Sequence, residues 1–228
     1  MFPFFYDPTF LLLIPALVLA LYAQFLVKST FTKYSKVPAS SGLTGAEVAE
    51  NLLRDGGLPQ VEIEEVPGEL TDHYDPRSKT LRLSPPISRS KSVAALGIAA
   101  HEVGHALQHK EAMAVFQIRQ SIVPVANLGS SLAFPLFFIG LIMSAKPLMD
   151  IGILLFSGAV LFQLVTLPVE FNASARALAL LQNRGYLAET EVTHARKVLN
   201  AAALTYVAAT AMAIVQLVRL LLLRSQRD

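Results

Sequence analysis

His101-Glu102-Val103-Gly104-His105 is the stretch of this chain that decides how the rest of the sequence is interpreted. It lies inside Ala94–Gln108, whose small and apolar residues predict a helix. Positions i and i+4 of a helix share one face, so both imidazoles can reach a single metal ion. The carboxylate of Glu102 lies beside them, placed to take a proton from a metal-bound water. The pattern therefore predicts the inner half of a zinc hydrolase site.

A plainer interpretation of the same stretch is a pair of core histidines with a surface glutamate. The neighbouring residues at 99, 100, 103, 104, 106 and 107 are uncharged, so this helix can be buried against other elements. A buried glutamate without a partner is costly. The metal site is therefore the favoured interpretation.

The composition is that of an integral membrane protein. Hydrophobic residues make up 53% of the chain and charged residues 16%, and the mean hydropathy is +0.49; soluble domains carry about 25% charge. The net charge is only +2, without a long basic run, so a nucleic-acid partner is not expected. Because the chain has no cysteine, disulfides are excluded and any zinc must use His, Asp or Glu.

Uncharged runs predict three to four transmembrane helices in a mainly α fold. Three runs are long enough to span a bilayer: Phe10–Val27, Leu128–Ala145 and Ile151–Val169. We expect Lys146–Asp150 to form the tight connection between the last two. A fourth candidate, Leu199–Val218, is richer in small and polar residues, and it could either span or pack in the bundle without crossing.

The charges flanking the first run predict its orientation. Lys28, Lys33 and Lys36 follow it, whereas Asp7 precedes it. The excess of lysine on the cytoplasmic side of membrane proteins then places the N-terminus outside. The region that follows, including the predicted site, is expected at the cytoplasmic face.

The stretch between the first two spans predicts a small α+β zinc-metalloprotease subdomain. Thr44–Glu47 fits a capping box at the start of a short helix, and Val61–Glu65 and Thr80–Ser84 alternate as strands do. The strand Thr80–Ser84 could be an edge that holds an extended peptide, or it could be purely structural. Ser88 or Ser90 is expected to cap the metal helix, beginning near Lys91.

These elements divide the chain into three expected regions. Residues 1–27 form an N-terminal transmembrane helix, and residues 28–127 form the cytoplasmic-side α+β region with the metal helix. Residues 128–228 hold the transmembrane hairpin, the helix of the third ligand and a C-terminal helix. Residues 182–197, which include His194, are expected to form a polar loop.

A catalytic zinc usually takes three protein ligands, so a third is needed. His109 is a poor candidate, because three ligands in a row on one straight helix would spread over about 12 Å. Glu170 ends an uncharged span, where a carboxylate requires a partner, although a solvated interfacial glutamate remains an alternative. The helix should continue to Leu178. Ser174, one turn after Glu170, could then orient a metal ligand.

Two further residues near Glu170 are candidates for supporting a ligand or contacting substrate. They are Asn172 and Arg176. For Arg176, contact with a lipid headgroup is an equal alternative.

Three blocks of the sequence together resemble a known family. They are HEVGHALQH at 101–109, Leu70–Pro76 with Leu81–Ser84, and Leu167–Ser174. They resemble the YugP-like membrane zinc metallopeptidases of bacteria, over nearly the whole chain. The layout is similar to that of the larger class of membrane gluzincins, with HExxH followed by a distant Glu. Ser174 departs from that class, which usually has Asp at this position.

The resemblance implies a zinc metallopeptidase of the bacterial plasma membrane, active on protein or peptide substrates at the cytoplasmic side. His101, His105 and Glu170 would hold one Zn²⁺, and Glu102 would be the general base, assisting attack of a zinc-bound water. The oxyanion needs one further donor, and the candidates are His73, Tyr74, Arg176, His194 and Tyr206. Competing hypotheses are a zinc-stabilised scaffold without turnover and a small transporter that binds a cation at Glu170.

Overall fold

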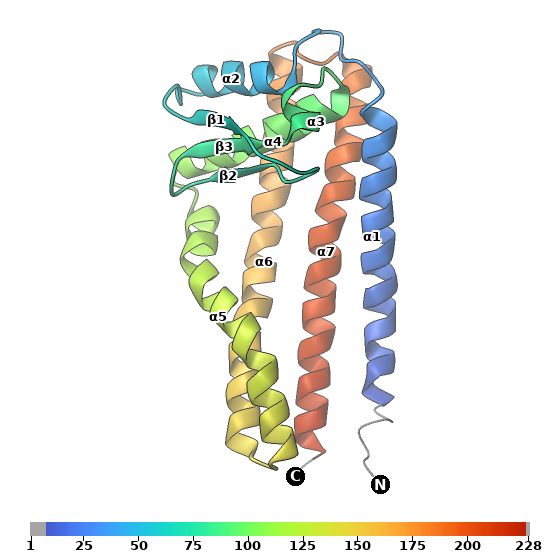
Figure 1. The fold of residues 1–228 in the computed structure, drawn as a ribbon, viewed down its shortest axis with the longest axis vertical. Coiled ribbons are helices and arrows are strands. Elements are labelled where there is room, and N and C mark those ends of the chain that lie inside the picture. Colours follow the sequence, from blue (N-terminus) through green and yellow to red (C-terminus); the bar gives the residue numbers. More distant parts are fainter. Residues whose placement is uncertain (1–7, 227–228) are drawn as a thin grey trace. The chain divides into compact units, whose positions relative to one another are not determined.

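The computed structural model describes residues 8–226. Its elements are, in order, η2 (Pro8–Leu12), α1 (Leu13–Tyr34), α2 (Gly45–Asp55), β1 (Glu62–Glu65), β2 (His73–Asp75), β3 (Thr80–Leu83), α3 (Pro85–Ser88), α4 (Val93–Lys110), α5 (Ala114–Ile142), α6 (Lys146–Asn183) and α7 (Glu189–Ser225). The expected class, mainly helical with a small sheet, is confirmed (Figure 1).

Within residues 8–226, four helical segments are long and apolar enough to cross a membrane. They are Pro8–Tyr34, Ala114–Ile142, Lys146–Asn183 and Glu189–Ser225. The fourth predicted segment, Leu199–Val218, therefore lies in a helix that is also long and apolar enough to span. Each helix is longer than the uncharged run that predicted it, because polar residues extend the helix beyond the apolar part.

Two predicted connections are wrong. Lys146–Asp150 is the start of α6, and the turn lies at 143–145, where Ser144 has φ +55°. Pro147 permits this because proline lacks an N–H that the first helical turn would leave unpaired in any case. The polar loop expected at 182–197 covers only residues 184–188, because α6 ends at Asn183 and α7 begins at Glu189. Its polar residues form an exposed helix face instead.

The described chain forms two compact units. The described residues of unit 1 come from the ranges 1–24, 118–167 and 205–228, and unit 2 consists of residues 25–117 and 168–204. In unit 1 a buried cluster joins α5, α6 and α7, and it includes Phe137, Met149 and Leu220. Other large apolar side chains of this unit are exposed, such as Leu154 at 72%. Such an exposed apolar surface suits contact with lipid.

Unit 2 contains a three-stranded sheet in the order β1-β3-β2. β1 runs parallel to β3, with Ile63 opposite Leu81, and β2 runs antiparallel, with Tyr74 opposite Leu81. The expected strand Thr80–Ser84 is therefore the central strand β3 and cannot be an edge. The edge strands are β1 and β2 (Figure 1). β2 was not predicted, because three residues are too few to show an alternating pattern.

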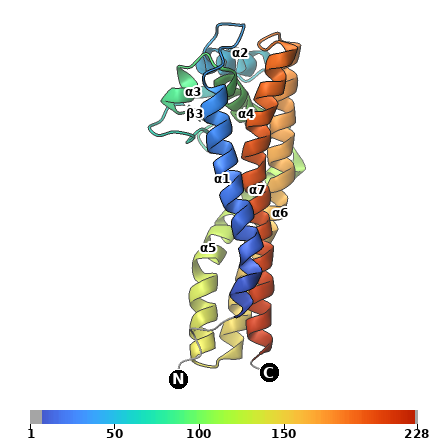
Figure 2. The same cartoon turned by 90° about the vertical axis from the view of Figure 1, so that its right-hand side faces the viewer.

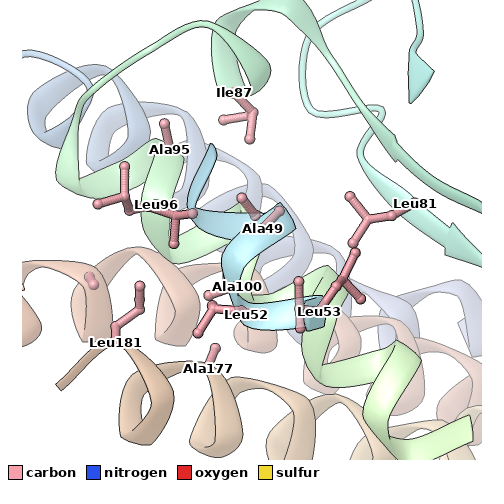
Figure 3. Close-up of a cluster of buried hydrophobic side chains, with 14 of the residues drawn as sticks. Ala49, Leu52, Leu53, Leu81, Ile87, Ala95, Leu96, Ala100, Ala177 and Leu181 are labelled. Atoms are coloured by element: carbon pink, nitrogen blue, oxygen red, sulfur yellow. The ribbon is translucent and has the colours of Figure 1, made fainter. Parts of the chain in front are cut away.

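The core of unit 2 holds the sheet against the helices. Leu52 of α2, Leu81 of β3 and Leu96 of α4 are fully buried in one cluster, which Ala177 and Leu181 of α6 complete (Figure 3). The predicted capping box begins α2: Thr44 Oγ1 accepts a hydrogen bond from the Glu47 amide, and Glu47 Oε2 accepts one from the Thr44 amide.

Helix α4 passes through this core and carries the HExxH motif. It begins at Val93, and its N-cap is Ser92, whose Oγ accepts from the Ala95 amide. The expected caps, Ser88 and Ser90, are wrong: Ser88 lies in α3 and Ser90 donates to Ser92 Oγ. The unit 2 parts of α6 and α7 lie beside α4 (Figures 1 and 2), and Gly104 of α4 permits the close approach to α6 described below.

Candidate metal centre

His101 and His105 of α4 meet Glu170 of α6 within unit 2. Glu170 Oε2 lies 3.3 Å from His101 Nε2 and 3.6 Å from His105 Nε2. The three possible ligand atoms all lie within 4.8 Å of one another, and the two rings are nearly perpendicular, at 85°. The Glu170 side chain is only 2% exposed. The three residues could therefore hold a metal ion.

The other nitrogen of each imidazole has its own partner. Ser174 Oγ lies 3.1 Å from His101 Nδ1, and Gln108 Oε1 lies 2.9 Å from His105 Nδ1. The amide oxygen of Gln108 can only accept, so His105 carries its proton on Nδ1. In the neutral ring, Nε2 then keeps its electron pair for a metal ion. This tautomer is the one that a metal ligand requires.

Gln108 is itself fixed by α6. Its Nε2 donates to the Val169 carbonyl at 2.8 Å and to Asn172 Oδ1 at 2.9 Å. The sequence analysis missed this residue. The only local sign was a lone amide side chain three residues after His105 on an apolar helix. The α6 residues that hold Gln108 in place are more than 60 residues away in the sequence.

Arg176 continues this network to the end of α4. Its Nε donates to Asn172 Oδ1 at 2.8 Å, and its two terminal nitrogens pair with the Glu111 carboxylate at 2.8 and 2.7 Å. The hydrogen bond from Arg176 lowers the pKa of Glu111. Asn172 and Arg176 therefore hold Gln108, and through it His105, and their described contacts are with the protein itself.

Glu102 is attached to the edge strand β2. The backbone N–H of Tyr74 donates to Glu102 Oε2 at 3.0 Å, and the Tyr74 hydroxyl lies 2.9 Å from His109 Nδ1. Both Glu102 and His109 belong to α4, so one residue joins the strand to the helix at two points. Burial raises the pKa of Tyr74, which keeps its hydroxyl protonated and able to donate.

The start of β2 is held by a separate contact. Asp72 accepts from the Ser84 amide at 2.7 Å and from Ser84 Oγ at 3.1 Å, which ties the entry of β2 to the end of β3. Burial raises the pKa of Asp72, although these hydrogen bonds act against it. This contact therefore extends the attachment of β2 to β3.

Among the described residues, the remaining candidates are not part of the group that could hold a metal ion. His73 is exposed and its Nδ1 contacts the Thr71 carbonyl; the alternation of a strand puts it on the face opposite Tyr74. His194 stacks on Tyr34 at 4.9 Å between ring centres. Tyr206 belongs to unit 1. His109 contacts Tyr74 and stacks on Phe116.

The donor set suits zinc. Two imidazole nitrogens and one carboxylate oxygen are the ligands of a common catalytic zinc site, and the chain offers no thiolate. A buried carboxylate also requires a positive partner. Burial opposes protonation of His105, but its hydrogen bond with Glu170 and the charges of Glu102 and Glu170 raise its pKa. The space between these three side chains therefore favours a positive charge.

Comparison with known families agrees with this chemistry. A family model described as "Putative neutral zinc metallopeptidase" matches residues 9–225, which is nearly the whole chain. The chain belongs to this zinc metallopeptidase family. Its membership makes it an enzyme of the metallopeptidase class that acts on protein or peptide substrates.

A curated relative supports the same assignment for this metallopeptidase. The protein named "Putative membrane protease YugP" from Bacillus subtilis (strain 168) is 50% identical over 212 residues, which cover 93% of this chain and 94% of the relative. The resemblance to the YugP-like family stated above is thereby confirmed. No solved structure matches the chain.

Proposed function

We propose that this metallopeptidase is a membrane-embedded endopeptidase that cuts protein substrates at the cytoplasmic face, with one Zn²⁺ held by His101, His105 and Glu170. The observation that carries the proposal is the convergence of both imidazole Nε2 atoms on the buried Glu170 carboxylate. Each imidazole is also held in place through its Nδ1 atom. This arrangement favours a metal site over two unrelated core histidines.

In the proposed mechanism Glu102 moves the protons. When bound, zinc supplies a Lewis acid that polarises the peptide carbonyl and acidifies a water molecule. Glu102 takes a proton from the attacking water and passes it to the leaving amine. The Tyr74 amide, which donates to Glu102 Oε2, holds the carboxylate in position for both transfers. Ser174 and Gln108 keep His101 and His105 oriented throughout.

Substrate in extended form can bind along β2. This strand is an edge of the sheet, and its Tyr74 N–H points towards Glu102 and away from β3. An extended peptide that adds to such an edge gains backbone hydrogen bonds and lies beside the general base. The proposal thus gives β2 the role that the sequence analysis considered for Thr80–Ser84.

The orientation in the membrane is proposed from charge. Lys28 and Lys33 lie in the last part of α1 and Lys36 just follows it, all in unit 2 together with the metal site. The bias of lysine towards the cytoplasm then places unit 2 there, in the bacterial plasma membrane. In this proposal residues 1–27 anchor the chain, residues 28–127 carry the motif and residues 128–228 supply the hairpin and third ligand.

The decisive test compares Glu102→Gln and Glu170→Ala with the wild type, measuring zinc content and casein cleavage. We expect Glu102→Gln to retain zinc and lose cleavage, and Glu170→Ala to lose both. Wild-type zinc without chelator-sensitive cleavage would support a scaffold instead. Unchanged cleavage by Glu102→Gln would refute its role as the base.

The orientation has its own test, because the chain has no cysteine. Single Lys36→Cys and Lys146→Cys variants are exposed in whole cells to a maleimide that cannot cross the membrane. We expect labelling of Lys146→Cys only, since in the proposed topology Lys36 follows the first span and Lys146 lies between the second and the third. Labelling of Lys36→Cys in intact cells would place the site outside.

A further inference from the structure

A small pocket lies next to Tyr74 and has no part in the proposed chemistry. Its volume is about 250 Å³, enough for one amino-acid side chain. Its apolar lining comes from Leu58 and Val61, which precede β1, and from Ala106 of α4. Tyr74 and His109, joined by their hydrogen bond, form another part of the lining.

The pocket lies at a definite distance from the general base. Ala106 and His109 follow Glu102 by four and seven residues on α4, on the same face of the helix. At about 1.5 Å per residue they lie roughly 6 and 10 Å along the helix from Glu102. An extended peptide advances about 3.3 Å per residue, so the pocket is two or three residues from the bond beside Glu102.

The charge at the pocket is positive. Lys79 and Lys110 contribute to its lining, both are exposed, and the lining residues include no carboxylate. Lys110 Nζ donates to the Gly56 carbonyl at 2.7 Å, which fixes its position and leaves further N–H groups. A side chain that fits this pocket would pack methylene groups against Leu58 and Val61 and place a negative charge near the two lysines.

We infer that this pocket receives an acidic side chain of the bound peptide, two or three residues from the bond that is cut. The inference rests on the proposed peptidase function and adds to it a substrate class. A glutamate side chain suits the pocket, because its methylenes meet the apolar lining while its carboxylate meets Lys79. A lysine side chain at the same place would meet two like charges.

This inference can be tested by measuring peptide binding to a variant that cannot cut the peptide. Short fluorescent peptides carry Glu, Gln or Lys at each position two or three residues on either side of the cut site. Their affinity is measured with zinc-loaded Glu102→Gln protein. At one position we expect the Glu peptide to bind roughly fivefold more tightly than the Lys peptide.

Charge reversal at Lys79 supplies the matched comparison. Lys79 has φ +54°, and this backbone already carries an unbranched side chain. Glutamate is also unbranched at Cβ, so Lys79→Glu should retain the fold. We expect Lys79→Glu to abolish the preference, because Lys110 remains and the two charges in the lining then offset each other. Lys197→Glu, at an exposed position of α7 outside the pocket, should leave it unchanged.

The outcomes separate the two proposals. Peptides that bind and are cut by the wild type without any acidic preference would overturn the pocket inference alone. Equal shifts in Lys79→Glu and Lys197→Glu would overturn it too, because they would reflect net charge. A zinc-loaded protein that neither binds nor cuts any peptide would overturn the proposed function and the inference together.

Discussion

Gly104 of α4 faces Ala173 of α6 so closely that a Cβ at position 104 would lie 2.8 Å from the Ala173 carbonyl oxygen. Gly104 directly precedes His105 on α4, and Ala173 lies between Glu170 and Ser174 in the sequence of α6. Glycine is therefore required at this point of the HExxH motif by the approach of two helices. Any side chain here must push α4 and α6 apart, and with them the possible metal ligands.

Gly104→Ala should therefore weaken zinc binding. The obstructing atom belongs to backbone, which cannot turn aside, so we expect a destabilisation of about 1–3 kcal/mol and at least a roughly tenfold loss of zinc affinity. Zinc content after dialysis against a weak chelator measures this. The control is Gly158→Ala in α6, where a Cβ meets nothing within 4 Å; zinc content that falls equally in both variants would contradict the explanation.

Removal of the metal should destabilise the wild type, because a ligand that binds only the folded state adds to its stability. We expect a strong chelator to lower the Tm of the detergent-solubilised wild type and of Glu102→Gln. The same treatment should leave the Tm of Glu170→Ala unchanged, since that variant has no zinc to lose. A chelator-induced shift in Glu170→Ala would show that Glu170 is not needed to hold the metal.

Gln108→Leu should lower zinc affinity by roughly 10- to 100-fold, the usual effect of removing a partner that orients a metal ligand. The substitution deprives His105 Nδ1 of its acceptor and the Val169 carbonyl of its donor. Competition with a fluorescent zinc chelator gives the affinity. Gln117→Leu, at an exposed position of α5, is the control and should retain the wild-type affinity.

Asp75→Asn should reduce stability in a way that depends on pH. The hydrogen bond from the Arg77 amide, followed by those from Ser78 and Arg82, lowers the pKa of Asp75 from 3.8 to about 2. A lowered folded-state pKa means that the carboxylate stabilises the fold above pH 3.8 and ceases to do so as the pH falls through 2. Thermal unfolding should show the variant less stable at neutral pH, with a difference that shrinks below pH 3.8. A difference that grows on acidification would contradict this assignment.

The sequence was sufficient for the long helices and for the motif. The i and i+4 spacing of His101 and His105 specifies a shared face, and the ends of apolar runs reveal where helices cross a bilayer. Glu170 could be proposed because a carboxylate at the end of such a run requires a partner. These inferences depend on local pattern, which a single sequence contains.

The sequence was insufficient where structure depends on distant contacts. β2 has three residues and is defined by its pairing with β3 and by the Tyr74–Glu102 bond. The polar start of α7 resembles a loop until its buried face is known, since Val192 and Ala195 pack into the core. Gln108 gains its role only from residues of α6.

One short stretch of α6 supports the whole centre. Glu170 and Ser174 lie one turn apart and contact the imidazoles directly. Asn172 and Arg176, also one turn apart, hold the side-chain amide of Gln108, which contacts His105. A shift of this stretch by a single residue would remove the carboxylate and the partners of both imidazoles together. The possible ligands and their supports should accordingly form together when this stretch of α6 folds, and be lost together when it unfolds.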